Sequence, residues 1–282
     1  MTLGEIYQQG KGMLFKAGNQ NAAFDAVCLF QNAFGLDHQA LLIHSNEQAD
    51  TARTKDYLAQ IAERAGGRPL QYIIGKWPFM ELELLVGEGV LIPREETELL
   101  VYTAAALLKS NSNPKILDLC SGTGAVALGL ASLLPQARIT AAELYDEAFT
   151  YLNHNIGKTG MRNVTPIQMD ILNPQRAESF LELDCIVSNP PYVTTSELSS
   201  LQTEVQSEPQ SALDGGADGL IFYRTIASLW LPRLKRGGVA AVEVGEGQAA
   251  EVAALFESAG LGQMDILTDF NSIERVVSGI MK

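Results

Sequence analysis

Four consecutive residues, Asn189-Pro190-Pro191-Tyr192, carry the clearest chemical pattern in the 282-residue sequence. They follow an apolar segment, residues 184–188, that has the composition of a buried strand. The two prolines fix φ and remove two N–H donors, so the backbone oxygens of Asn189 and Pro190 are presented in a stiff turn. Such stiffness suits a preorganised site, although Asn and Pro are also ordinary residues of strand-ending turns.

The chemistry expected of this element is the activation of a planar nitrogen. An amide or aromatic-amine nitrogen is a poor nucleophile because its lone pair is delocalised, but it has two hydrogens to donate. The side-chain oxygen of Asn189 and the carbonyl of Pro190 can each accept one of them and aim the lone pair at an electrophile. Tyr192 can stack on the planar group. Asn189, Pro190 and Tyr192 are therefore the predicted catalytic residues, and no general base is required.

A glycine turn earlier in the chain can hold the electrophile. Residues 116–119 read as a buried strand, and the turn at residues 120–124 leads directly into a helix. Its glycines allow close backbone approach, and the helix start offers free N–H groups. Glu143 ends the next expected strand about 20 residues on, where an acid can bind both hydroxyls of a ribose.

The turn alone also fits a dinucleotide-binding oxidoreductase, so its neighbours decide between ligands. Asp118 precedes it, where a carboxylate can fix the turn or face a cationic amino group. S-adenosylmethionine has an amino group and a sulfonium but no pyrophosphate, and it is the predicted cofactor. Asp170 follows the third expected strand and can contact an adenine amino group; a helix cap near Asn173 is the alternative.

Alternating elements after residue 114 predict an α/β fold with a largely parallel sheet. The expected strands are residues 115–119, 138–143, 164–169, 184–188, 238–244, 264–268 and 275–278, and the expected helices are residues 123–134, 146–157, 219–234 and 248–259. Residues 2–65 have helical periodicity, and residues 71–92 read as a strand pair. We expect a helical domain over residues 1–70, a hairpin linker over 71–93 and a catalytic domain over 94–282.

The composition and net charge limit the classes of partner that we expect the protein to bind. The net charge is −13 and the pI is about 4.7, which disfavours binding to nucleic acid. Arg53, Lys55, Arg64 and Arg68 can still form a local basic patch. The three cysteines are scattered, so neither disulfides nor a metal site is expected. No signal peptide or membrane span is recognisable, so we expect a cytoplasmic protein without membrane contact.

The sequence resembles the HemK-type N5-glutamine methyltransferases of peptide-chain release factors. Besides the glycine turn and residues 189–192, the shared motifs are residues 68–75, 90–98, 208–209, 212–213, 218–220, 223–224 and 275–277. The resemblance covers nearly the whole chain. It implies a seven-stranded, Rossmann-like class I methyltransferase domain, joined by a β-hairpin to a small N-terminal helical bundle that helps hold the release factor.

The same resemblance implies that the glutamine of a Gly-Gly-Gln loop enters the site. We also expect the protein to be a monomer. With the motif chemistry, the resemblance gives a cofactor-binding set of Asp118, Cys120, Ser121, Gly122, Thr123, Gly124, Glu143, Asp170, Ile171 and Asn189. The expected substrate-binding set is Asn189, Pro190, Pro191, Tyr192 and Arg94. The resemblance also places Pro93 and Glu98 near the mouth of the site.

Four residues depart from the family pattern. Cys120-Ser121 stands where Gly-Thr or Gly-Cys is usual, Glu143 replaces the commoner Asp, and Asn271 replaces a Gly. The first is expected to narrow the cofactor turn. The alternatives left open are methylation of a ribosomal-protein glutamine or of an adenine amine, a nicotinamide oxidoreductase, and a module that binds S-adenosylmethionine without catalysis.

Overall fold

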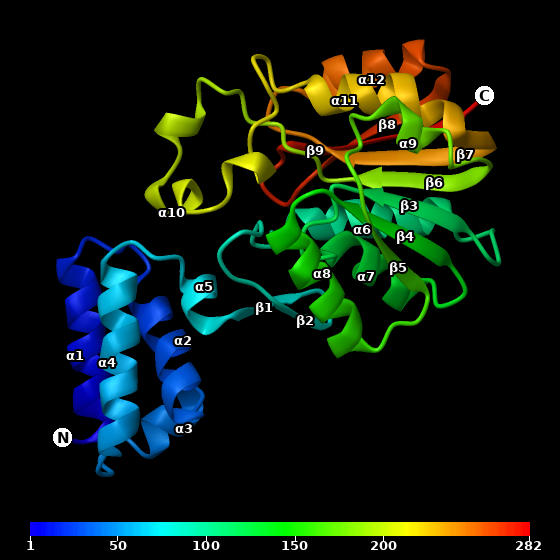
Figure 1. Ribbon diagram of the computed structural model, residues 1–282. Coiled ribbons are helices and arrows are strands. Elements are labelled where there is room, and N and C mark those ends of the chain that lie inside the picture. The colour runs from blue at the N-terminus through cyan, green and yellow to red at the C-terminus, as the bar shows by residue number, and fades with distance from the viewer. The chain divides into compact units, whose positions relative to one another are not determined.

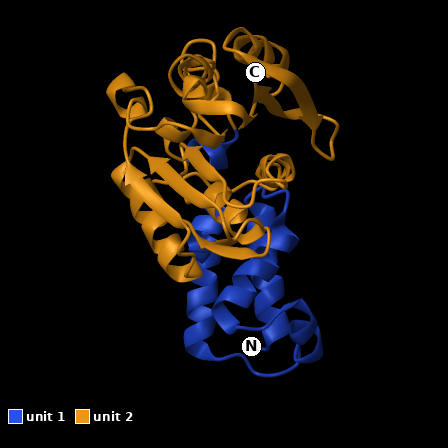
Figure 2. Cartoon of the chain, turned by 90° about the vertical axis from the view of Figure 1, so that its right-hand side faces the viewer, with its two compact units in different colours: residues 1–76, 202–207 blue, residues 77–201, 208–282 orange.

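The computed structural model describes residues 1–282 and contains two compact units (Figure 2). Unit 1 consists of residues 1–76 and 202–207, and unit 2 consists of residues 77–201 and 208–282. The chain therefore leaves unit 1 after residue 76 and contributes one further short segment to it from within the second half of the sequence.

Unit 1 is a helical bundle, as predicted. Its helices are α1 (Leu3–Lys16), α2 (Ala22–Phe34), α3 (His38–Ile43), α4 (Thr51–Ala65), α5 (Leu70–Ile74) and α10 (Thr203–Gln206). Thr2 and Glu5 form a capping box at the start of α1, which satisfies N–H groups that the first turn leaves free. The core centres on the fully buried rings of Phe30 and Tyr57. The short helix α5 was not predicted.

A buried arginine lies inside unit 1. Arg64 is 5% exposed, and its Nε donates to the Asp25 carboxylate at 2.6 Å. A second carboxylate, Glu204 of α10, also pairs with this guanidinium. The Arg53 guanidinium donates to a backbone carbonyl, and Arg68 pairs with a neighbouring glutamate. Arg64 therefore cannot contribute to the expected basic patch, because it is buried between two acids, whereas Arg53 and Lys55 are exposed.

The sheet of unit 2 has seven strands in the order β5-β4-β3-β6-β7-β9-β8 (Figure 1). The strands are β3 (Lys115–Leu119), β4 (Arg138–Glu143), β5 (Val164–Gln168), β6 (Leu183–Ser188), β7 (Leu234–Glu243), β8 (Leu261–Thr268) and β9 (Glu274–Met281). Strand β9 alone runs in the direction opposite to the other six strands. The predicted α/β class is confirmed. The predicted strand pair is also present, as the hairpin β1 (Lys76–Phe79) and β2 (Leu82–Leu85).

Helices cover both faces of this sheet (Figure 1). One face carries α6 (Thr97–Leu107), α7 (Ala125–Leu133) and α8 (Asp146–Thr159), and the other carries α9 (Pro174–Ala177), α11 (Ile221–Thr225) and α12 (Ala249–Ser258). The short turns are η1 (Leu198–Ser200), η2 (Gln210–Ala212), η3 (Ile226–Trp230) and η4 (Leu231–Arg233). No helix is both long and apolar enough to cross a bilayer.

Two helix predictions need correction. The expected helix over residues 219–234 is broken into α11, the π-helical turn η3 and the 3-10 turn η4. Pro232 lies in η4, where its missing N–H prevents a regular α-helix from continuing. Helix α6 was not predicted at all. Its residues are apolar on nearly every side because it packs between the sheet and α7, so the usual two-sided period is absent.

The strand order has a reversal that bears on where a ligand binds. Strands β3 and β6 are neighbours in the sheet, although β4 and β5 lie between them in the chain. The order reverses at this point, and the carboxyl ends of β3, β4, β5 and β6 meet at one edge. Ligands of open α/β sheets bind outside such a switch point.

Candidate active site

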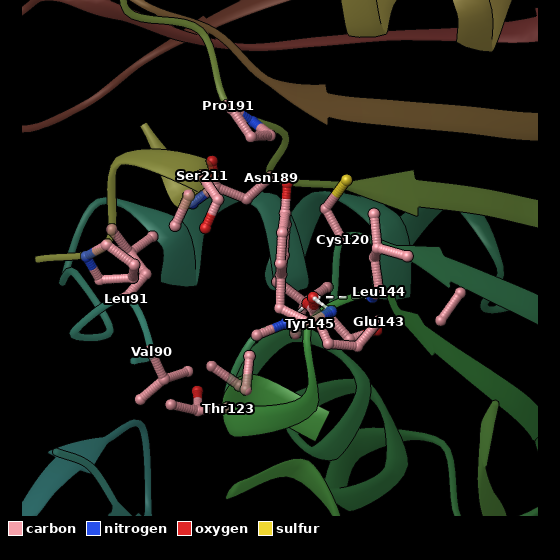
Figure 3. A pocket seen from close by; sticks show the side chains of 18 of the residues that line it. Val90, Leu91, Cys120, Thr123, Glu143, Leu144, Tyr145, Asn189, Pro191 and Ser211 are labelled. Atoms are coloured by element: carbon pink, nitrogen blue, oxygen red, sulfur yellow. Dashed lines mark hydrogen bonds between the residues drawn. The ribbon is translucent and has the colours of Figure 1, made fainter. Parts of the chain in front are cut away.

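A cavity of about 330 Å³ opens at this edge, entirely within unit 2 (Figure 3). Its walls come from the segments that follow β3, β4, β5 and β6, together with residues 89–94 and 209–212. Ten predicted site residues reach the walls: Arg94, Cys120, Ser121, Gly122, Thr123, Glu143, Asp170, Ile171, Asn189 and Pro191. Four do not: Asp118, Gly124, Pro190 and Tyr192.

The two glycines of the turn have different surroundings. Gly122 has φ +54, and a Cβ placed on it would meet nothing closer than Val90 at 3.9 Å, so its space is part of the cavity. Gly124 has φ +85, and a Cβ there would lie 2.7 Å from the Leu152 side chain. Gly122 therefore leaves room for a ligand, whereas Gly124 allows the turn to pack against α8.

Cys120 occupies a position that favours glycine. Its φ is +59, the left-handed region that costs about 1–2 kcal/mol for a residue with a Cβ. Burial raises the pKa of its thiol well above the ordinary value, so the sulfur stays protonated. The unusual residue is thus accommodated in the same backbone conformation that a glycine would adopt here.

The Glu143 carboxylate is held by three backbone N–H groups. Its Oε2 accepts from Gly122 at 2.8 Å, and its Oε1 accepts from Leu144 at 2.8 Å and Tyr145 at 3.0 Å. The side chain is 7% exposed and forms part of the cavity wall. A carboxylate has about four acceptor sites, so capacity remains for a ligand hydroxyl. The glycine turn and the end of β4 are locked together by this one side chain.

Asp118 lies beneath the turn. It is 1% exposed, and neither carboxylate oxygen accepts a hydrogen bond. Burial raises its pKa to about 7, and the Ser121 hydroxyl donates to the Asp118 backbone carbonyl and not to the carboxyl group. An unpaired buried carboxyl is costly to a fold, and such groups concentrate at functional sites.

The end of β5 contributes Asp170 and Ile171. Asp170 Oδ1 accepts from the Leu172 amide at 2.8 Å, and the carbonyl of buried Ile171 accepts from Trp230 Nε1 at 2.9 Å. The helix cap belongs to Asn173, which accepts from the amide of Gln175. The backbone of this segment is therefore fixed while Asp170 and Ile171 line the cavity.

Asn189 makes a contact that sequence reasoning missed. Its Nδ2 donates to Thr97 Oγ1 at 3.2 Å, and Thr97 Oγ1 donates to Glu243 Oε2 at 2.6 Å. Thr97 is the first residue of α6, and Glu243 is the last residue of β7. An acid at the end of a strand beside β6 was detectable by the same pattern that singled out Glu143.

The other members of the tetrapeptide are placed differently. Pro191 lines the cavity, and Pro190 is buried without lining it. The Tyr192 carbonyl accepts from Gln248 Nε2 at 3.0 Å, and burial raises the pKa of the Tyr192 phenol. A Cβ on Gly245 would lie 3.0 Å from the Tyr192 ring. Tyr192 thus packs against the start of α12 at a position behind the cavity wall.

The mouth of the cavity includes an ion pair. Arg94 pairs with the buried Glu208 carboxylate, which also accepts from the Ile92 amide at 3.0 Å. Pro93 and Arg94 line the cavity as expected. Glu98 does not; it instead accepts from the Met80 amide at 2.8 Å and anchors the β1–β2 hairpin.

Two family models match this chain. The family model described as PrmC N-terminal domain matches residues 5–75, and the one described as Methyltransferase small domain matches residues 96–220. The fold is also that of the hMettl16 catalytic domain in complex with a MAT2A 3′UTR hairpin, at a TM-score of 0.57 and 15% identity over 79% of this chain and 82% of that one.

Two curated relatives have the same name, release factor glutamine methyltransferase. The one from Geobacter sulfurreducens is 36% identical over 99% of this chain and 96% of its own length. The one from Thermodesulfovibrio yellowstonii is 38% identical over 83% of this chain and 82% of its own. With 36% identity to one such relative over 99% of its length, the chain belongs to the release factor glutamine methyltransferase family.

Proposed function

We propose that the protein transfers the methyl group of S-adenosylmethionine to the side-chain amide nitrogen of the glutamine in the Gly-Gly-Gln motif of class 1 peptide-chain release factors. The names of its relatives support this substrate. The placement of Asn189 supports the chemistry. This residue lies in the cavity wall, its NH₂ group donates to Thr97, and its side-chain oxygen accepts from no protein donor.

The cavity fits the proposed cofactor. Gly122 leaves open space beside the turn, Glu143 keeps acceptor capacity for ribose hydroxyls, and Asp170 and Ile171 offer a polar and an apolar contact to an adenine. Cys120 to Gly124 would hold the amino-acid end, with the Asp118 carboxyl beneath them. When bound, S-adenosylmethionine supplies a methyl group on a cationic sulfur, so the leaving group needs no acid.

The chain's own residues would orient the acceptor. Asn189 Oδ1 and the Pro190 carbonyl accept the two N–H hydrogens of the glutamine amide and direct its lone pair into the cavity. The rigid backbone of Pro190 and Pro191 keeps these acceptors in place. Tyr192, which lies behind the cavity wall, would support the tetrapeptide from the side of Gln248, and Arg94, held by Glu208, would contact the substrate at the mouth. After transfer, the nitrogen loses its extra proton to water.

The same proposal covers partners and location. The partner is a release factor. The protein binds it as a monomer and methylates it in the cytoplasm. An exocyclic adenine amine has the same two hydrogens, but a net charge of −13 and the burial of Arg64 between two acids disfavour a nucleic-acid partner.

The decisive experiment uses labelled S-adenosylmethionine with three acceptors: a release factor, the same factor with its Gly-Gly-Gln glutamine changed to alanine, and double-stranded DNA. Label in the first alone, and a mass increase of one methyl group on the Gly-Gly-Gln peptide, is the expected result. Label in DNA alone, or equal label in the altered factor, would contradict the proposal.

A further inference from the structure

Asn189, Thr97 and Glu243 form a short relay of hydrogen bonds that runs away from the cavity. Asn189 Nδ2 donates to Thr97 Oγ1 at 3.2 Å, and Thr97 Oγ1 donates to Glu243 Oε2 at 2.6 Å. Thr97 and Glu243 are each 3% exposed. Asn189 and Thr97 line the cavity, whereas Glu243 lies behind them and does not. Glu243 can therefore affect the substrate only through its neighbours.

The direction of the relay follows from counting protons. An ionised carboxylate can only accept, so the single hydroxyl proton of Thr97 goes to Glu243. Thr97 Oγ1 is then left with lone pairs, which only the NH₂ end of Asn189 can satisfy. The two ends of a carboxamide have nearly the same shape, so packing alone does not choose between them. The charge on Glu243 therefore makes the choice, and it leaves Asn189 Oδ1 free.

We propose that Glu243, acting through Thr97, is a positioning group that holds the Asn189 carboxamide with its oxygen toward the incoming amide N–H. The inference rests on the proposed function, because that function makes Asn189 Oδ1 an acceptor for the glutamine. In the opposite orientation the Asn189 NH₂ would face the substrate NH₂, and two donors cannot bond to each other.

The surroundings of Glu243 make this relay sensitive to protonation. Burial raises the pKa of Glu243 to about 7, although the Thr97 hydroxyl and the charges of Arg275 and Arg94 lower it. The remaining charged or titratable groups that face it are Glu96, Tyr192 and Tyr223. A protonated Glu243 carboxyl can donate to Thr97 Oγ1. The Thr97 hydroxyl can then donate to Asn189 Oδ1, the atom that is meant to accept from the substrate. The kcat should therefore fall as the pH drops through about 7.

The first test replaces the middle of the relay. Thr97→Val removes the hydroxyl with little change in shape, and Thr103→Val makes the same change at another buried threonine of α6 that has no part in the relay. We expect kcat for release-factor methylation in Thr97→Val to be about 10-fold below that of Thr103→Val, with S-adenosylhomocysteine affinity unchanged. Thr97→Ser, which restores the hydroxyl, should recover most of the loss. A kcat less than fivefold below the control would overturn the inference.

The second test reverses the relay and does not depend on Thr97→Val folding. In Asn189→Asp, two carboxylates compete for the one Thr97 proton. Adding Glu243→Gln supplies an NH₂ that can donate to Thr97, so that Thr97 can donate to the new carboxylate at position 189. The double variant should turn over at least fivefold faster than Asn189→Asp alone, and it should lack the acid fall in kcat. A double variant no faster than the single one contradicts the proposed relay.

These outcomes separate the relay from the proposed function. If the unmodified protein fails to methylate the release factor, the proposed function fails. If it methylates the factor but the Thr97 and Glu243 variants behave like the Thr103→Val control, only the relay fails. Thermal unfolding of each variant distinguishes a lost fold from a misplaced Asn189, because a merely structural role would lower stability without changing the pH profile.

Discussion

Replacing Asp118 by asparagine should stabilise the protein above pH 7, although it removes a charged residue from beneath the proposed cofactor turn. The Asp118 carboxyl is 1% exposed and has no hydrogen-bond partner, and burial raises its pKa from 3.8 to about 7. Because the folded-state pKa is above the unfolded value, the folded state binds more protons between these two values. Stability is therefore lost as the pH rises from about 4 to 7.

The magnitude follows from the size of the shift. A rise from 3.8 to about 7 corresponds to about 4 kcal/mol of lost stability at pH 8, at 1.36 kcal/mol per pKa unit. An asparagine at this position also lacks hydrogen-bond partners, which costs about 1–3 kcal/mol and offsets part of this gain in stability. Asp118→Asn should thus be more stable than the unmodified protein by about 1–3 kcal/mol at pH 8, and this advantage should vanish at pH 5.

Urea unfolding at pH 5 and pH 8 measures this difference, with Asp184→Asn as the matched control. The Asp184 pKa is lowered by the Lys115 amide, Lys235 and Asn111, although its own burial opposes them, so its replacement should destabilise the protein at pH 8. Equal effects of the two substitutions, or a loss of stability at pH 8 in Asp118→Asn, would show that the Asp118 carboxyl is solvated or paired. Weaker S-adenosylhomocysteine binding by Asp118→Asn is expected as well, and it would explain why a destabilising carboxyl is kept.

Three further predictions concern the site and its frame. Asn189→Ala should lower kcat by about 10²–10³-fold while calorimetry finds S-adenosylhomocysteine affinity within a few-fold of normal; near-normal turnover would remove Asn189 from the mechanism. Asn155→Ala should lower the free energy of unfolding in urea by about 3 kcal/mol, because it leaves the Leu85 N–H, the Leu85 C=O and one carbonyl of the glycine turn without their hydrogen-bond partner. A loss below about 1 kcal/mol would mean that water replaces these bonds. Cys120→Gly should bind S-adenosylhomocysteine at least as tightly as the unmodified protein, because φ +59 suits glycine, and a tenfold weaker Kd would show that the thiol contacts the ligand.

The strands were the most predictable part of the fold. Residues 115–119 and 138–143 match β3 and β4 at both ends, because a buried apolar run meets a turn signal on each side. Helix α6 escaped prediction because a helix buried on most sides has no polar face to reveal its period. The end of the helical segment within residues 219–234 could have been predicted from Pro232, because proline lacks the N–H that a continuing α-helix requires.

The parts of the site that lie within single segments of the sequence could be predicted. The glycine turn, Glu143 and Asn189 could be placed at one edge because parallel strands end together. The bond between Thr97 and Glu243 joins positions 146 residues apart and depends on how the start of α6 lies against the end of β7. No local motif contains that information, and the same holds for the pairing of Arg94 with Glu208.

The short segment 202–207 has a consequence for how this protein could be recombined. The family model for the N-terminal domain ends at residue 75, yet unit 1 also contains Glu204, which pairs with the buried Arg64. Moving residues 1–76 alone onto another catalytic domain would leave Arg64 with Asp25 as its one acidic partner in a site built for two. Unit 1 is thus one module in space but two in sequence, and an exchange of domains between relatives must carry both pieces or supply a substitute acid.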